Sequence, residues 1–141
     1  MKKYKGTYER DTGGRELYFP LSPQGEGFGD CVFRACSIAT GLDYKLVWDT
    51  LFDLGKEMGY LPNDPKVYEK FLLDHGFTKN KPPKDNRGKK ISIRNWSAEA
   101  PKGRIVASTR EHLIAIVDNV QRDTWLDERC VNSWFHKEAQ Q

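Results

Sequence analysis

Apolar residues recur at helical spacing in three segments of the first half of the chain. The first segment spans 31–40 and ends at Gly41, a residue type that commonly follows the last turn of a helix. The second runs over 43–58 and begins with a capping aspartate. The third follows the Asn-Asp-Pro sequence at 63–65, a strong start signal, and stops at Gly76. We therefore predict three consecutive helices.

The second half of the chain alternates between apolar and polar residues, which is the pattern of half-buried strands. Residues 90–96 and 103–109 are predicted strands. Residues 112–117 and 120–125 flank the turn-forming pair Asp118-Asn119 and predict a β-hairpin. Because helices come first and antiparallel strands follow, we predict an α+β fold, with N-terminal helices packed on a small antiparallel β-sheet.

The remaining segments lack clear periodicity. Residues 1–27 are polar, with one short apolar patch, and predict an extended arm that packs its aromatic residues on the body. Residues 126–135 predict a loop with a short aromatic segment, and residues 136–141 predict a polar tail. A chain of 141 residues without internal repeats fits one domain, 1–141, with one core.

Composition narrows the class of protein. Charged residues make up 30% and hydrophobic residues 38%, and no apolar stretch approaches the roughly 20 residues that span a bilayer. No apolar segment follows the basic N-terminus, so we expect no signal peptide, no membrane partner and a cytoplasmic location. The net charge of +3, from 23 basic and 20 acidic residues, is too balanced to indicate nucleic-acid binding.

Residues 79–90 hold the one local excess of charge, with six basic residues against one acidic residue. The favoured interpretation is a solvated loop, since two prolines and a glycine interrupt the run. The alternative is a patch that steers an acidic partner.

The three cysteines, Cys31, Cys36 and Cys130, form an odd and sparse set. A disulfide framework needs an even set and a structural zinc site needs closely paired cysteines, so we interpret all three as thiols. Cys36 and Cys130 are interpreted as buried small hydrophobic residues. Cys31 differs because it follows a glycine-rich loop and opens a helix, where unpaired N–H groups and the helix dipole favour the thiolate.

His112 opens an otherwise apolar strand, and hairpin geometry gives it a partner. With Asp118-Asn119 at the two turn positions, Val117 opposes Val120, and Asp123 becomes a diagonal neighbour of His112 on one face of the sheet. Asp118 itself lies about 20 Å along the strand from His112, at ~3.3 Å per residue. A slip of one residue in this register would move Asp123 to the opposite face.

Cys31, His112 and Asp123 together predict nucleophilic catalysis by a thiol. Cys31 would attack a carbonyl carbon, His112 would carry the proton, and Asp123 would orient the imidazole. For the oxyanion we expect the backbone N–H of Cys31 and the side chain of Gln24 as donors. Trp125 is either a core residue or a substrate-binding wall beside the imidazole. The three residues also have the ligand types of a metal site, but their spacing gives it little support, so we expect no metal and no cofactor.

Two stretches of the chain resemble a known family. Residues 30–41 and 105–118, followed by Asp-Thr-Trp at 123–125, are similar to small phage- and prophage-encoded domains related to papain-like cysteine peptidases. The similarity is greatest to the peptidases that cut leader peptides at double-glycine sites, and it covers about residues 28–135. It implies a papain-like fold, in which a helix carries the cysteine at its start and a sheet carries the histidine and the aspartate. It also implies the papain-type roles for Cys31, His112 and Asp123.

Two positions depart from the pattern of this family. Asn119 stands in the hairpin turn where a glycine is expected. The glutamine expected six residues before the cysteine is absent, because position 25 is a glycine and Gln24 is one position away.

The sequence leaves two functions open. The first is a thiol-dependent peptidase or amidase of phage or bacterial origin, which cleaves a peptide or isopeptide bond in a peptide or protein substrate. The second is a catalytically inactive papain-like binding protein that modulates a host factor. The second is motivated by the displaced glutamine, by the basic run 79–90 and by Asp30, whose charge beside Cys31 opposes a thiolate unless Asp30 caps the helix instead.

Overall fold

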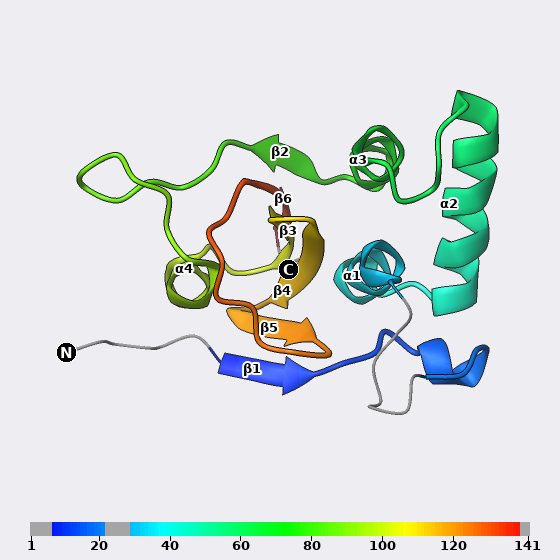
Figure 1. Ribbon diagram of the computed structural model, residues 1–141, viewed down its shortest axis with the longest axis horizontal. Coiled ribbons are helices and arrows are strands. Elements are labelled where there is room, and N and C mark those ends of the chain that lie inside the picture. Colours follow the sequence, from blue (N-terminus) through cyan, green and yellow to red (C-terminus); the bar gives the residue numbers. More distant parts are fainter. Residues whose placement is uncertain (1–6, 22–28, 139–141) are drawn as a thin grey trace.

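A computed structural model describes residues 7–21 and 29–138 of the chain (Figure 1). Its strands are β1 (Thr7–Arg10), β2 (Thr78–Asn80), β3 (Arg104–Thr109), β4 (His112–Val117), β5 (Val120–Asp123) and β6 (Ser133–Lys137). Its helices are α1 (Cys31–Thr40), α2 (Tyr44–Met58), α3 (Pro65–Asp74) and α4 (Ile93–Glu99), with a short 3-10 helix η1 (Arg15–Leu17). Within these residues the strands form one mixed sheet in the order β1-β5-β4-β3-β6-β2, so the α+β class is confirmed.

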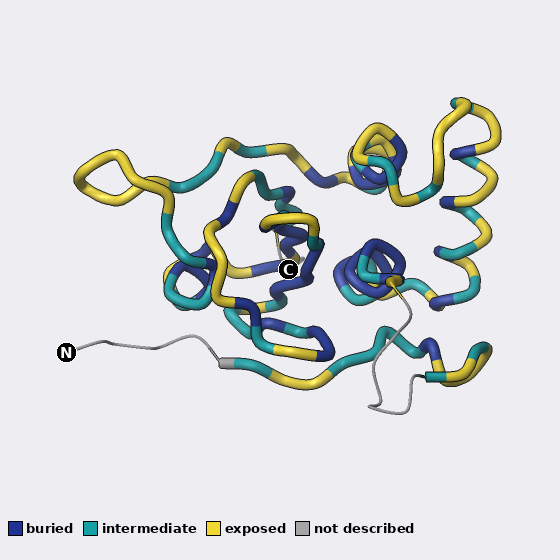
Figure 2. Tube along the Cα trace, viewed as in Figure 1, coloured by how far each residue is buried: buried dark blue, intermediate teal, exposed yellow. Residues whose placement is uncertain are grey.

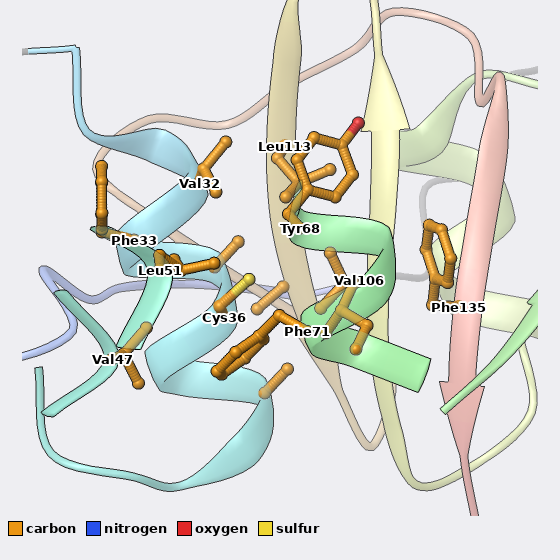
Figure 3. Close-up of a cluster of buried hydrophobic side chains, with 14 of the residues drawn as sticks. Val32, Phe33, Cys36, Val47, Leu51, Tyr68, Phe71, Val106, Leu113 and Phe135 are labelled. Atoms are coloured by element: carbon orange, nitrogen blue, oxygen red, sulfur yellow. The ribbon is translucent and has the colours of Figure 1, made fainter. Parts of the chain in front are cut away.

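Helices cover both faces of the sheet, α1 to α3 on one face and α4 on the other (Figure 1). The first face buries a cluster that includes Cys36, Phe71 and Leu113 (Figure 3). The second buries Ile93 and Trp96 of α4 against β3 and β4. Buried positions concentrate where these helices meet the sheet (Figure 2). Because α1 packs directly on β4, the helix that begins with Cys31 is fixed on the strand that begins with His112.

The three predicted helices are confirmed. The helix α1 ends at Gly41, whose φ of 76° is left-handed backbone that glycine adopts readily. The Asp43 side chain caps α2 by accepting hydrogen bonds from two backbone N–H groups of its first turn. Asp64 caps α3 by accepting one hydrogen bond, from the backbone N–H of Lys66, and Pro65 takes the first helical position.

The predicted hairpin of β4 and β5 is also confirmed. Asp118 and Asn119 both have positive φ, 49° and 70°, which is the backbone of a type I′ turn, and Val117 pairs with Val120. The Asn119 side chain gives a reason for asparagine at this position. Its Nδ2 donates to the carbonyl oxygens of Ser97 and Ala100, both at 2.8 Å, and so links the turn to the end of α4.

The strand predicted over 90–96 is wrong, because most of this segment belongs to α4. The Ser92 hydroxyl accepts from the Asn95 backbone N–H and caps the helix. Ile93, Trp96 and Ala100 then lie one helical turn apart on the buried face. The alternation of so short a segment fits both a strand and a helix start, and the serine cap favours the helix.

The sheet is not wholly antiparallel, because β1 pairs with β5 in parallel. The described part of the predicted arm 1–27 therefore contains a strand and η1. The predicted tail 136–141 is also wrong in part, since His136 and Lys137 belong to β6, which lies between β3 and β2. These strands form because distant segments supply their hydrogen-bonding partners, and local periodicity does not record that pairing.

Residues 84–90 of the basic run are exposed, as expected of a solvated loop, and they form a short excursion closed by a bridge between Lys84 and Lys90. The start of the predicted loop, at residues 79 and 80, instead belongs to the edge strand β2. The prediction for Cys130 is wrong, because its side chain is exposed, whereas Cys36 is fully buried as predicted. Within the described residues, no helix combines the length and the apolar character needed to cross a membrane.

Candidate active site

Cys31 lies at the first turn of α1, at the wall of a cavity of about 410 Å³. The cavity lies between the start of α1, the start of α3 and the turn from β3 to β4, and His112 lines it as well. The thiol is partly accessible, unlike the fully buried Cys36 five residues later in the same helix. The fold therefore brings the predicted nucleophile and the predicted base to one cavity.

A tight turn places His112 at this cavity. Thr109 pairs with His112 across the β3–β4 hairpin, so Arg110 and Glu111 form a two-residue turn, with Glu111 at a φ of 54°. The Nε2 atom of His112 lies 2.5 Å from Oδ2 of Asp123. Because Nε2 faces Asp123, Nδ1 is the ring nitrogen left for the sulfur of Cys31, which lines the same cavity. The fold thus gathers the three predicted residues at one place.

Asp123 is held from several directions. Its carboxylate is 2% exposed, and its Oδ1 accepts from the backbone N–H of Thr124 at 2.7 Å and from Nη2 of Arg34 at 3.0 Å. Because Oδ1 has these two donors, Oδ2 stays directed at the imidazole. The predicted register of the hairpin explains why Asp123 lies near His112. The pairing of β5 with β4 ends at Arg122, and Asp123 itself pairs with Arg10 of β1.

The electrostatics favour a thiolate and an imidazolium. Burial acts to raise the pKa of the Cys31 thiol. The opposing effects are larger, and they come from the hydrogen bond and charge of His112, the backbone N–H of Leu113 and the charge of Arg34. The pKa of Cys31 therefore lies below its usual value. Burial acts to lower the pKa of His112, whereas its hydrogen bonds to Asp123 and Cys31 raise this pKa to about 9. Both shifts favour proton transfer from sulfur to imidazole.

Asp30 does not oppose the thiolate in the way its sequence position suggests, and its side chain does not cap α1. Its carboxylate is buried and forms ion pairs with Nη1 of Arg34 and, at 3.2 Å, with Nη1 of Arg15. The Tyr44 hydroxyl donates to the same carboxylate at 2.5 Å. Two cations therefore balance the negative charge beside Cys31.

Arg34 is the functional residue that the sequence analysis missed. Its guanidinium is buried and bridges Asp30 and Asp123, so it joins the helix of the nucleophile to the strand of the orienting carboxylate. Burial acts to lower the pKa of Arg34, but Asp123 and Asp30 raise it above its usual value. The signal that could have indicated this role is an arginine within an apolar helical run, four residues after an aspartate.

Trp125 covers the imidazole and is not a core residue. Its ring centroid lies 4.8 Å from that of His112, its side chain is 38% exposed, and the Arg129 guanidinium lies 5.2 Å from the ring centroid. The described lining of the cavity does not include Trp125. Gln24, the predicted oxyanion donor, lies outside the described residues.

Metal ligands do not gather at this site or elsewhere in residues 7–21 and 29–138, where no group of three or more histidine, cysteine, aspartate or glutamate side chains could hold a metal ion. Comparisons of the chain with protein-family models, with curated proteins and with solved structures gave no match. Function is therefore inferred from the geometry of the site.

Proposed function

We propose that this protein is a thiol-dependent peptidase or amidase that cleaves a peptide or isopeptide bond, with a papain-like arrangement of Cys31, His112 and Asp123. The observation that carries the proposal is the placement of the thiol and the imidazole at the wall of one cavity, with the imidazole hydrogen-bonded to a buried carboxylate. The resemblance to phage- and prophage-encoded papain-like domains supports the same reaction class.

The reaction follows from the roles of the three side chains. The Cys31 thiolate adds to the carbonyl carbon of the scissile bond, and the carbonyl π electrons move to its oxygen. As this oxyanion collapses, the carbon–nitrogen bond breaks and His112 gives its proton to the leaving amine. Water, deprotonated by the neutral His112, then hydrolyses the thioester and returns the thiol. Asp123 holds the ring orientation and stabilises the imidazolium throughout.

Backbone donors are available where the sulfur lies. The Asp30 side chain makes no capping hydrogen bond to the first N–H groups of α1, which include that of Cys31. The helix dipole adds positive potential at the same place. Cys31 N–H is therefore a proposed oxyanion donor, and Gln24 remains a second proposed donor.

The alternative function, an inactive binding protein, loses one of its arguments. It was motivated in part by the charge of Asp30, and that charge is paired with Arg15 and Arg34. A poised thiolate with an oriented imidazole is costly to maintain in a protein that only binds, because such groups are desolvated and must be held in place.

Alkylation by iodoacetamide at neutral pH, read by peptide mass spectrometry, tests the nucleophile. Cys130 is the internal control, since it is more exposed than Cys31 and has no histidine partner among the described residues. We expect Cys31 to react about tenfold faster than Cys130 despite its lower exposure, because the thiolate is the reactive form. Equal labelling of the two thiols would contradict the proposal.

The pH dependence of this labelling tests whether His112 lowers the pKa of Cys31. The rate should fall as the pH drops through the pKa of Cys31, and this midpoint should lie below about 8.5, the value of a free thiol. In His112→Ala the main partner that lowers this pKa is gone while burial still raises it, so the midpoint should move to higher pH. If the midpoint is unchanged in this variant, His112 is not the partner of the Cys31 thiolate.

A further inference from the structure

Tyr68 of α3 lines the same cavity as Cys31 and His112. Its side chain is 9% exposed, and its ring packs edge-on against Phe135, with centroids 6.5 Å apart. Figure 3 shows the hydroxyl turned away from the buried cluster, at the end where Val32 and Leu113 lie. These two residues directly follow Cys31 and His112 in the chain, so the hydroxyl lies at the catalytic end of the cluster.

The other hydroxyl groups around the cavity already have partners. Thr109 donates to Asp127 at 2.7 Å, and the Ser108 hydroxyl lies 2.9 Å from that of Ser133. The Tyr68 hydroxyl, in contrast, has no hydrogen-bond partner within the described part of the chain. A polar group carried to a cavity on an otherwise buried ring is arranged to meet a ligand.

The hydroxyl also keeps its proton at neutral pH. Burial, followed by the charges of Glu69, Cys36 and Cys31, raises the pKa of Tyr68 to about 12. It is therefore a hydrogen-bond donor at neutral pH, where the lowered pKa of Cys31 favours the thiolate. Tyr68 and Cys31 both line the cavity of about 410 Å³, so one bound substrate can meet both groups.

The geometry points to Tyr68 as a further catalytic residue, whose hydroxyl donates a hydrogen bond to the carbonyl oxygen of an acyl substrate as that oxygen becomes an oxyanion. This assignment rests on the proposed function of Cys31. When the thiolate adds to the carbonyl carbon, the negative charge forms on the oxygen, and the Tyr68 O–H stabilises it without giving up its proton. When the carbonyl reforms, the bond to the leaving group breaks and the hydrogen bond weakens again. The substrates are acyl compounds: peptides, esters or thioesters.

Two reagents separate this role from the role of the nucleophile. Iodoacetamide alkylates Cys31 by displacement at a saturated carbon and forms no oxyanion, whereas p-nitrophenyl acetate acylates it through a tetrahedral intermediate. Tyr68→Phe removes only the hydroxyl and keeps the ring on Phe135. We expect Tyr68→Phe to leave the alkylation rate within about twofold and to lower the acylation rate about 10²-fold, the usual effect of losing one oxyanion donor.

Tyr60→Phe is the matched control, because Tyr60 is exposed and does not line the cavity. It should leave both rates unchanged, and circular dichroism should show the same fold in both variants.

If Tyr68→Phe acylates at the wild-type rate, or slows with both reagents equally, the assignment of Tyr68 is wrong while Cys31 stands. If the wild type alkylates at Cys31 but never acylates there, the proposed function fails, and the role of Tyr68 fails with it. Asn63 also lines the cavity, and if only Asn63→Ala lowers acylation, the donor is Asn63 and not Tyr68.

Discussion

Asp123 and Asp127 are buried carboxylates four residues apart, and they serve different structures. Asp123 contacts His112 and Arg34, which come from β4 and α1. Asp127 contacts the Thr109 hydroxyl and, within its own loop, the backbone and side chain of Arg129. The first carboxylate belongs to a series of charges that reaches a thiol, and the second closes a loop. Burial and hydrogen bonding are common to both, so the link to a nucleophile at a cavity is what marks the site.

Asp127 and its contacts form one cluster and Asp123 and its contacts form another, and the Asp127 cluster also affects the site. Gln121 is fully buried, and its side-chain amide exchanges hydrogen bonds with the backbone N–H and C=O of Asp127, each at 3.1 Å. This exchange fixes both ends of the loop that carries Trp125, the residue stacked near His112. The Asp127 cluster therefore supports the shape of the site, whereas the Asp123 cluster supplies its charge.

The largest expected difference between the two clusters is the loss of stability when the arginine of each is replaced. Arg34→Met leaves Asp30 and Asp123 buried with one cation fewer, and breaking such a buried pair costs about 3–5 kcal/mol. Arg129→Met is the control, since the Arg129 side chain is 41% exposed and its loss should cost about 1 kcal/mol. Urea unfolding followed by tryptophan fluorescence measures both. Equal losses would mean that Arg34 is not the centre of a buried network.

The next difference is in reaction rate, on neutralisation of the two carboxylates. In Asp123→Asn the amide cannot accept from both His112 and Arg34, so the imidazole loses its orientation and the Cys31 acylation rate should fall by about 10²–10³-fold. Asp127→Asn should cost about 1–3 kcal/mol of stability, through its hydrogen bonds, while the rate stays within about threefold. Comparable rates in the two variants would remove the distinction between the clusters.

Local signals in the sequence predicted the positions of Cys31, His112 and Asp123, and the resemblance to papain-like peptidases suggested that they lie together. A glycine-rich loop before a helix identifies the position of Cys31, and the turn pair 118–119 sets the register that relates His112 to Asp123. The sequence did not predict α4, because a short alternating segment fits two structures until the Ser92 cap is taken into account. It also missed β1 and β6, whose hydrogen-bonding partners are distant in the chain.

The ion network was beyond sequence reasoning for a different reason. The sequence shows Asp30 beside Cys31 and at the start of a helix, but its effect depends on Arg15 and Arg34, which tertiary packing brings to it. The same reason applies to Tyr68, because helical spacing predicts that its ring is buried but does not predict where its hydroxyl lies. Charge balance and cavity lining are properties of the packed chain, and periodicity records neither.

The smallest expected effect concerns two tyrosines that each donate to an aspartate. The Tyr44 hydroxyl donates to Asp30 at 2.5 Å and accepts from Arg15 at 3.2 Å, in a site where Tyr44 is 1% exposed. The Tyr18 hydroxyl donates to Asp43 at 2.6 Å, but that pair is open to solvent. Water replaces a lost partner only in the second case.

Tyr44→Phe should therefore lower the free energy of unfolding by about 1–2 kcal/mol, because a charged acceptor loses a buried donor. Its ring stays in place beside Trp48, so packing is preserved. Since Asp30 keeps both arginines, the alkylation rate of Cys31 should change by less than about threefold. Tyr18→Phe should change neither quantity measurably. A large loss of Cys31 reactivity in Tyr44→Phe would show that the balance of charge around Asp30 depends on the hydroxyl as well as on the two cations.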